Sequence, residues 1–390
     1  MSALRLFPVP AGPDVLDVLA DIEGSLSGGP ALLPYAADGP APAVPPHDPA
    51  DLPEQLALAI GTSGSTGMPK RALLTAPALQ ASAGGTHDVL GGPGDWLLLL
   101  PAHHIAGLQV LVRSIVAGRV PTVGDAIGGF TAAVFTRAVA SMSKAPGRRY
   151  TALVPTQLGR LLDDEAALAA LAAFDGVLVG GASTPVAMRR RALEAGVRLV
   201  LTYGMSETAG GCVYDGEALP VARIHIDNER HIVLGGETIA HGYLGDAART
   251  ADAFSVDSDG TRWFRTDDLG HLDDAGLLVM DGRADDVITT GGLKITPGVV
   301  EDAIARHLPN VRDVVVLGMP DPEWGEVVSA AITLMDPTSH VTTQDLRDQL
   351  RGILPDAALP RRSVVLPTIP HRGPGKPDRA ALRHAIEEHR

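Results

Sequence analysis

Short apolar runs alternate with stretches of helical periodicity along the first half of this chain. The runs that read as buried strands are 56–60, 96–100, 150–154, 176–180 and 198–203. The stretches that predict helices are 76–90, 106–117, 156–173 and 184–195. This β-α-β-α order predicts an α/β fold with mostly parallel sheets flanked by helices. In such sheets ligands bind beyond the carboxyl ends of the strands, so functional side chains are expected in the loops there.

The length of 390 residues exceeds what one hydrophobic core usually supports. Composition changes after the segment GRADD, which predicts a large domain over 1–281, a hinge over 282–286 and a small α+β domain over 287–390. In the small domain, the pattern predicts helices near 297–307 and 343–353 and strands near 313–319 and 327–335. Residues 27–53 are rich in Pro, Gly and Ala and are expected to form a connecting arm on the surface.

Composition argues against several partners. The formal net charge of -14 repels nucleic acid, and no basic stripe reverses it locally. No segment approaches the ~20 consecutive apolar residues that a membrane span requires. The single cysteine, Cys212, excludes an internal disulfide and fits a reducing compartment, so a cytoplasmic location is expected.

The segment IGTSGSTGMPKRALLT (60–75) follows a predicted strand and precedes a predicted helix. Its backbone N–H groups and hydroxyls can surround a triphosphate, and Lys70 adds a positive charge. Arg71 stands where a Walker A loop needs Ser or Thr, which argues against a P-loop kinase. A surface turn of low complexity is the alternative for this segment alone. The phosphate-binding candidates are Thr62, Ser63, Gly64, Ser65, Thr66, Gly67 and Lys70.

Two further segments carry groups that suit a nucleotide. In TYGMSETAGG (202–211), Tyr203 can stack on a purine, Ser206 can bind a phosphate and Glu207 is a hard oxygen ligand for Mg²⁺. Further along, Asp268 can accept both hydroxyls of a ribose, and Arg283 can donate to the same sugar or to a phosphate. Taken singly, each segment is also compatible with a solvated turn or hairpin.

Taken together and in this order, the segments resemble the core motifs of the adenylate-forming superfamily, which includes acyl-CoA synthetases, luciferases and adenylation domains. The resemblance covers 55–390 and implies ATP, Mg²⁺ and coenzyme A as cofactor and co-substrates. It adds Gly181, Ala182, Thr202, Gly204 and Met205 to the ATP-binding residues. It further implies that Lys376 is the catalytic lysine of adenylation, that Asp285 is the hinge of a mobile C-terminal domain, and that CoA passes Gly291, Gly292 and Lys294.

The resemblance extends to the acid. In PAHHIAG (101–107), His104 takes the position of a histidine that contacts the acyl pocket and is counted with Lys376 and Glu207 as catalytic. The short front of the chain, HHIAGLQVLVRS and YGMSETAGGCVYDG together resemble actinobacterial o-succinylbenzoate:CoA ligases of menaquinone synthesis. The acyl-pocket residues implied are His104, Gly180, Thr208, Gly210, Gly211 and Arg113. A second carboxylate needs a cation, although a surface or interdomain place for Arg113 is an equal alternative.

The resemblance thus implies an acid–thiol ligase that forms o-succinylbenzoyl-CoA through an acyl-adenylate, releasing pyrophosphate and AMP. One alternative is a CoA ligase for another aryl or short-chain carboxylic acid. Another is a nucleotide-binding module without turnover, against which Lys376 and Glu207 argue, because binding alone needs neither. The expected partners are these small molecules, and the sequence is compatible with a homodimer.

Overall fold

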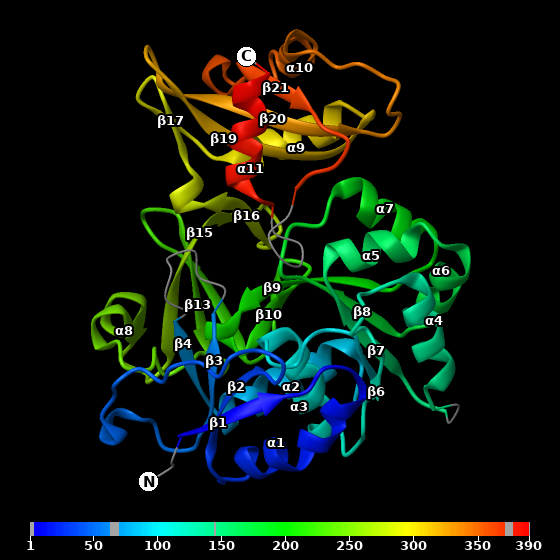
Figure 1. Ribbon diagram of the computed structural model, residues 1–390. Coiled ribbons are helices and arrows are strands. Elements are labelled where there is room, and N and C mark those ends of the chain that lie inside the picture. The colour runs from blue at the N-terminus through cyan, green and yellow to red at the C-terminus, as the bar shows by residue number, and fades with distance from the viewer. Residues whose placement is uncertain (1–3, 63–69, 144–145, 371–376, 390) are drawn as a thin grey trace. The chain divides into compact units, whose positions relative to one another are not determined.

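The computed structural model describes residues 4–62, 70–143, 146–370 and 377–389 (Figure 1). The chain divides into two compact units. The first consists of Met1–Ser183, Arg191–His225 and Val233–Thr266. The second consists of Thr184–Arg190, Ile226–Ile232 and Asp267–Arg390. The segment 282–286 lies inside the second unit, and its role as a hinge stays a prediction.

The central element of the first unit is a seven-stranded sheet with the order β11-β10-β9-β8-β7-β5-β6. Strands β9, β8, β7, β5 and β6 are parallel, and β10 and β11 add an antiparallel edge. The prediction of a mostly parallel sheet is therefore confirmed. The strands are β5 Asp95–Leu98, β6 Thr122–Val123, β7 Arg149–Leu153, β8 Gly176–Val179, β9 Leu199–Met205, β10 Gly210–Tyr214 and β11 Glu217–Ala218.

Helices cover both faces of this sheet. Figure 1 shows α2 and α3 on one face and α5 on the other. Helix α2 begins where the Thr75 side chain accepts a hydrogen bond from the Ala78 N–H and ends at Gly91, whose φ is 86°. The helix predicted over 156–173 is in fact two, because Asp164 caps a new start by accepting from the Ala167 N–H. The helices are α2 Ala76–Leu90, α3 Ile105–Val116, α4 Ala132–Ser141, α5 Pro155–Leu162, α6 Glu165–Ala172 and α7 Val186–Glu194.

A separate four-stranded sheet, β1-β2-β3-β4, precedes the large one. Its elements are β1 Leu4–Val9, β2 Ala31–Ala36, β3 Leu56–Gly61 and β4 Arg71–Thr75, with helix α1 Leu19–Leu26. The expectation of a surface arm over 27–53 was wrong for its first part, because β2 pairs in parallel with β1 and β3. Residues Ala31, Leu32 and Leu33 are almost completely buried, so their apolar side chains outweigh the strand-breaking neighbours.

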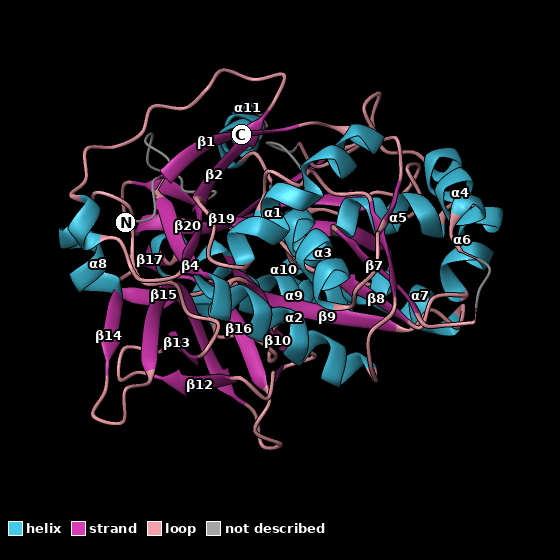
Figure 2. Ribbon diagram, turned by 90° about the horizontal axis from the view of Figure 1, so that it is seen from below, coloured by secondary structure: helices cyan, strands magenta, loops and turns pink. Residues whose placement is uncertain are grey.

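A third sheet has the order β12-β13-β15-β14, with β16 paired to β15 (Figure 2). The boundary between the two compact units falls within β12, β13 and β15. Its elements are β12 Ala222–Ile226, β13 His231–Gly236, β14 Phe254–Val256, β15 Arg262–Leu272 and β16 Leu278–Arg283, with helix α8 Ala247–Ala253.

The second unit contains a sheet whose two faces are both covered. Along β19, Val316 joins the core under α9 and α10, whereas Val315 and Leu317 join the core under α11. This alternation is the period of two that a strand imposes. The helix predicted over 297–307 is confirmed as α9. The elements are β17 Ile288–Thr290, β18 Leu293–Ile295, α9 Pro297–His307, β19 Val311–Asp321, β20 Gly325–Leu334, α10 Thr343–Leu350, β21 Arg362–Val365 and α11 Arg379–Glu388.

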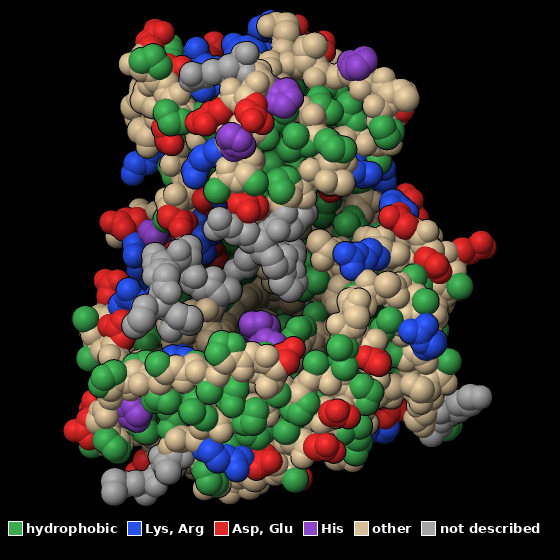
Figure 3. All heavy atoms as spheres, viewed as in Figure 1, with side chains coloured by type: hydrophobic (Ala, Val, Ile, Leu, Met, Phe, Trp, Pro, Cys, Tyr) green, Lys and Arg blue, Asp and Glu red, His purple; other side chains and the backbone are tan. Residues whose placement is uncertain are grey.

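Helix hydrophobicity and surface charge bear on the possible partners of this chain. Within the residues that the structure describes, no helix combines the length and apolarity needed to cross a bilayer. On the face drawn in Figure 3, basic and acidic side chains are interspersed.

Candidate active site

A tight turn joins β9 to β10 and carries the motif TYGMSETAGG. Short helix η3 (Ser206–Thr208) follows β9 directly, and β10 then returns antiparallel to it. A Cβ at Gly204 would lie 2.1 Å from the carbonyl oxygen of Gly210, so glycine is required for the two strands to approach this closely. The turn therefore fixes Ser206 and Glu207, both 7% exposed, at the carboxyl end of β9.

The base of the predicted phosphate loop lies beside this turn. Ser206 donates from Oγ to the carbonyl of Gly61 at 3.0 Å. The Thr62 N–H donates to the Lys70 carbonyl at 2.8 Å, which closes the loop at its two ends. The loop candidates Ser63, Gly64, Ser65, Thr66 and Gly67 lie outside the described residues. The ends of both predicted ATP motifs thus meet in the first unit.

Tyr243 connects the phosphate-loop lysine with the predicted magnesium ligand. Its hydroxyl donates to Oε1 of Glu207 at 2.9 Å, and the ammonium of Lys70 lies 5.2 Å from the centre of its ring. Glu207 is held from its backbone too, because its carbonyl accepts from the Ala240 N–H at 2.8 Å. Sequence reasoning missed Tyr243, since the segment AHGYLGD carries no side chain that itself points to nucleotide chemistry.

A single carboxylate at this position suits Mg²⁺ bound to a nucleotide. Within the described ranges, no three His, Cys, Asp or Glu side chains gather as a metal-binding group. Mg²⁺ commonly takes one or two protein carboxylates and completes its shell with waters and substrate phosphates. The buried, hydrogen-bonded Glu207 fits that role, and Lys70 provides a nearby cation for the same phosphates.

The neighbouring strand brings GGA (180–182) to the same edge of the sheet. Strand β8 pairs in parallel with β9, with Val179 opposite Leu201, so both carboxyl ends point the same way. A Cβ at Gly180 would lie 2.3 Å from Oγ1 of Thr202, which requires glycine, and Gly181 has a φ of 81°. Tyr203 is half-buried in β9 opposite Val213. The structure thus brings Gly180 next to Thr202, and Gly181 and Ala182 follow it in the chain.

His104 caps the amino end of α3, with the His103 ring centroid 4.2 Å from its own. Burial, and then the charge of His103, lowers the pKa of His104 to about 4. The His104 side chain keeps an exposed surface, and solvent there screens part of this effect. The direction nevertheless leaves the imidazole neutral near pH 7, so it can exchange hydrogen bonds with a substrate without adding charge.

Arg113, on the same helix, is buried. It is 3% exposed, which excludes a surface position. Its Nη2 donates to the hydroxyl of Tyr214 at 3.3 Å, its Cζ lies 5.0 Å from the Trp96 ring centre, and its Nε has no partner in the described structure. No carboxylate among the described residues pairs with it, and burial lowers its pKa while Tyr214 acts in the opposite direction. The helix thus holds an uncompensated buried cation.

A second unsatisfied polar atom lies one helical turn earlier. Gln109 is 1% exposed, and its Nε2 donates to the carbonyl of Ala209 at 2.7 Å, whereas its Oε1 has no described partner. A Cβ at Gly210 would lie 3.3 Å from Cγ of Gln109. Thr208 is held in the turn, where its hydroxyl donates to the Gly210 carbonyl at 2.7 Å. Helix α3 therefore presents the polar side chain of Gln109 to Gly210 at the start of β10.

In the second unit, Arg283 gathers three aspartates. Asp268 and Arg283 face each other across β15 and β16, with 3.6 Å between Oδ1 and Nη1. The guanidinium also pairs with Asp285 at 2.8 Å and Asp267 at 3.4 Å. Burial alone would lower the pKa of Arg283, but the aspartates, with Asp285 foremost, raise it. The ribose candidate and the hinge candidate thus share one cation, a link that sequence spacing did not predict.

The segment GGLK forms an exposed hairpin between β17 and β18. Its two turn residues, Gly291 and Gly292, have φ values of 55° and 80°, as a two-residue hairpin turn requires. Gly291 also donates its N–H to the Trp324 carbonyl at 3.0 Å. Lys294 is exposed on β18. The predicted adenylation lysine, Lys376, lies outside the described residues.

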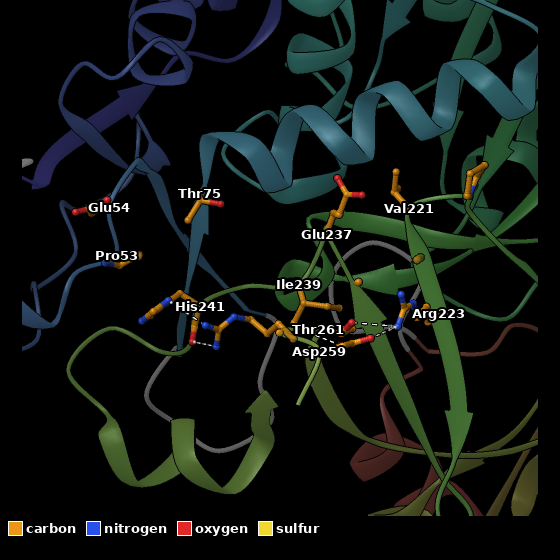
Figure 4. A pocket seen from close by; sticks show the side chains of 15 residues that line it. Pro53, Glu54, Thr75, Val221, Arg223, Glu237, Ile239, His241, Asp259 and Thr261 are labelled. Atoms are coloured by element: carbon orange, nitrogen blue, oxygen red, sulfur yellow. Dashed lines mark hydrogen bonds and ion pairs between the residues drawn. The ribbon is translucent and has the colours of Figure 1, made fainter. Parts of the chain in front are cut away.

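A depression of about 600 Å³ lies elsewhere in the first unit (Figure 4). Its charged lining residues are Arg223 and Arg262 with Glu54, Glu237 and Asp259, while burial and then Arg262 lower the pKa of the sixth titratable lining residue, His241. Arg223 pairs with Asp259 at 3.3 Å, and Arg262 donates to the His241 carbonyl at 3.2 Å. None of the predicted site residues lines it, so this depression is not the site that the motifs describe.

Comparison with known proteins places these features in a family. Residues 16–237 match the AMP-binding enzyme family, and residues 299–376 match the AMP-binding enzyme C-terminal domain. The fold is shared with apo MatB from Rhodopseudomonas palustris, at a TM-score of 0.75 and 20% identity over 100% of this chain and 90% of that one. It is also shared with o-succinylbenzoate CoA synthetase from Bacillus subtilis, solved with the acyl-adenylate OSB-AMP, at a TM-score of 0.70 and 23% identity over 97% and 83%.

Two relatives extend the comparison to sequence. A probable 2-succinylbenzoate–CoA ligase of Mycobacterium tuberculosis is 43% identical over 382 residues, covering 97% of both chains. A 2-succinylbenzoate–CoA ligase of Salmonella typhimurium is 33% identical over 347 residues, covering 86% of this chain and 70% of the relative. Together with the turn that carries Ser206 and Glu207, these matches show that the chain belongs to the adenylate-forming, AMP-binding enzyme family.

Proposed function

We propose that this chain is an o-succinylbenzoate:CoA ligase, which uses ATP to convert the acid to its adenylate and then transfers the acyl group to coenzyme A. The product would serve menaquinone synthesis. The similarity to ligases named for this acid supports the choice. The observation that carries it is the buried, uncompensated Arg113, whose hydrogen-bond partner Tyr214 ends the strand that begins with Gly210 and Gly211.

In the first half-reaction, a carboxylate oxygen of the acid attacks the α-phosphorus of ATP, and the bond to pyrophosphate breaks. Lys70 and Ser206 would bind phosphate oxygens, and Tyr203 would offer an aromatic face to adenine. Mg²⁺, when bound at Glu207, neutralises charge on the triphosphate. Tyr243 holds the Glu207 carboxylate in one orientation, so that little reorganisation is needed when the metal nucleotide arrives. Lys376 would stabilise charge on the reacting carboxylate and α-phosphate.

In the second half-reaction, the thiol sulfur of CoA attacks the acyl carbon, and AMP leaves with the electrons of the broken acyl–oxygen bond. The exposed hairpin at Gly291 and Gly292 would line the path of the thiol-bearing arm. Asp285, bound to Arg283 at 2.8 Å, is the proposed hinge about which the C-terminal domain would turn between the two half-reactions. Asp268 and Arg283 would contact the ribose.

The acid itself is recognised through its second carboxylate. A guanidinium buried without a counter-ion costs several kcal/mol of folding free energy. A bound dicarboxylate would supply that counter-ion, whereas a monocarboxylate would leave Arg113 uncompensated. The buried Nε of Arg113 has no partner in the described structure and is a donor that such a carboxylate would satisfy.

The test is AMP release dependent on ATP and CoA, with o-succinylbenzoate compared with benzoate, salicylate and a short fatty acid. A clear preference for o-succinylbenzoate is expected. Turnover of another acid in preference would keep the chemistry and replace the substrate. Absence of AMP release with every acid would instead favour a nucleotide-binding module.

A further inference from the structure

A chain of buried hydrogen bonds leads from Arg113 to helix α2. The hydroxyl of Thr86 donates to the carbonyl of Ser82 at 2.8 Å, so its hydrogen is already committed. The Thr86 and Tyr214 oxygens lie 2.8 Å apart, and Tyr214 is therefore the donor between them. This leaves the lone pairs of the Tyr214 oxygen to accept from Nη2 of Arg113 at 3.3 Å. The chain of donors thus runs in one direction, from the guanidinium to Ser82.

The Arg113 guanidinium also packs over a neutral aromatic ring, that of Trp96. Trp96 is 0% exposed and offers its ring to Arg113, while its Nε1 donates to Nε2 of His87 at 3.4 Å. Because this ring nitrogen accepts, it carries no proton. Burial, and then the charge of Arg113, lowers the pKa of His87 to about 4, so His87 is neutral near pH 7. The surroundings orient Arg113 without neutralising it.

The Tyr214 ring also lies against the acyl-pocket glycines. A Cβ at Gly211 would lie 3.1 Å from Cε1 of Tyr214 and 3.1 Å from Cβ of Thr202. Tyr214 is 3% exposed at the end of β10, the strand that begins with Gly210 and Gly211. One side chain therefore contacts both the proposed carboxylate-binding cation and the strand proposed to line the pocket.

We infer that Tyr214 is a specificity-determining positioning residue, whose hydroxyl holds Arg113 in the orientation that binds the non-reacting carboxylate of the acid. This inference rests on the proposed function. Tyr214 acts through Arg113 and takes no part in bond making. Removing its hydroxyl leaves a second guanidinium N–H without an acceptor and lets the cation turn away from the pocket. The loss should therefore fall on acids that carry two carboxylates.

The experiment compares wild type with Tyr214→Phe on o-succinylbenzoate and on two analogues that each lack one carboxylate, 4-oxo-4-phenylbutanoate and 2-butanoylbenzoate. The analogue that supports AMP release identifies the reacting carboxylate. The variant is expected to raise KM for o-succinylbenzoate about 10-fold or more, as loss of one hydrogen bond to a charged group implies. KM for the active analogue and for ATP should change less than about twofold. Thr86→Val, which removes the acceptor of the Tyr214 hydroxyl, should shift the same KM in the same direction by less.

Tyr150→Phe is the matched control. Tyr150 is also 0% exposed, and its ring is tilted against that of Trp96 with the centroids 5.1 Å apart, but its hydroxyl donates to the carbonyls of Leu90 and Gly92. It should leave the ratio between the two acids unchanged. Equal losses on both acids in Tyr214→Phe and Thr86→Val, or an unchanged ratio, would overturn the positioning role while the proposed function stands. Failure of the wild type to use o-succinylbenzoate would overturn both.

Discussion

The hydroxyl of Tyr243 donates to Oε1 of Glu207 at 2.9 Å, while Lys70 approaches the ring of the same tyrosine. A carboxylate proposed to hold Mg²⁺ and a lysine proposed to bind phosphate are thus positioned by one residue that contacts neither ligand in the proposed mechanism. The arrangement separates two effects that substitution can test independently, because the ring and the hydroxyl of Tyr243 have different partners.

Tyr243→Phe should raise KM for the Mg²⁺ complex of ATP about 10-fold. The substitution removes a hydrogen bond to a carboxylate, worth about 1.5–3 kcal/mol, but keeps the ring that Lys70 contacts. Steady-state AMP release at varied ATP and Mg²⁺ concentrations measures it. Tyr35→Phe, in β2, is the control. Unchanged dependence on both ATP and Mg²⁺ would show that Glu207 needs no support from Tyr243.

Lys376→Ala should lower acid-dependent pyrophosphate release at least about 100-fold, because electrostatic stabilisation of a transferring group is a large part of such rate enhancements. Transfer to CoA from a supplied acyl-adenylate should persist. Lys294→Ala is the reciprocal variant, with pyrophosphate release retained and thioester formation slowed. Wild-type pyrophosphate release in Lys376→Ala would contradict the proposed role of this lysine and the two-step division of labour.

Much of the fold was predictable from the periodicity of apolar residues and from the prolines that begin helices. Helix α2 spans the predicted 76–90 and α9 the predicted 297–307, because each combines a periodic apolar face with a proline at its start. Strand β2 was not predicted because residues 27–53 are rich in proline and glycine, although they also contain the buried apolar run from Ala31 to Leu33. Strand β3 was predicted, but the sheet it joins is a matter of long-range pairing.

The candidate site also contains residues that the sequence predicts and residues that it does not. Ser206 and Glu207 were predictable because their motif is contiguous and the turn that carries it needs glycine at fixed positions. The residues that orient them were not, since Tyr243 meets Glu207, and Tyr214 meets Arg113, only through folding. Burial of Arg113 could not be read from its helix, where a lone arginine fits a surface face equally well. Sequence thus suggests the groups proposed to touch ligand more readily than the groups that position them.

Glu301→Gln should make the protein more stable in alkaline solution. Glu301 accepts from the Val316 N–H at 2.7 Å, and burial raises its pKa from about 4.5 to about 7 against the opposing effect of that bond. A carboxyl group with a raised pKa stabilises the fold below its unfolded pKa and loses that contribution as pH rises through the folded pKa. The variant should therefore gain about 1–3 kcal/mol in the free energy of unfolding at pH 8.5 and little at pH 5.

Urea unfolding at the two pH values measures this difference. Glu387→Gln, at an exposed position of α11, should change neither value. Equal effects of Glu301→Gln at pH 5 and pH 8.5 would mean that Glu301 does not change its ionisation over this range.

Gly204→Ala should disrupt the turn on which the proposed chemistry depends. The new Cβ would lie 2.1 Å from the Gly210 carbonyl oxygen and 2.8 Å from the Gly211 Cα, and backbone atoms cannot move aside as a flexible side chain can. We expect a loss of about 2–4 kcal/mol in the free energy of unfolding, as for other overpacked sites. AMP release should fall even in the fraction of the variant that remains folded, because separating β9 from β10 displaces Glu207 from Tyr243. Gly24→Ala, inside α1 with nothing within 4 Å of its Cβ, should instead be neutral or stabilising. If Gly204→Ala melts at the wild-type temperature and retains full AMP release, the close approach of the two strands is not what holds the Glu207 carboxylate in place.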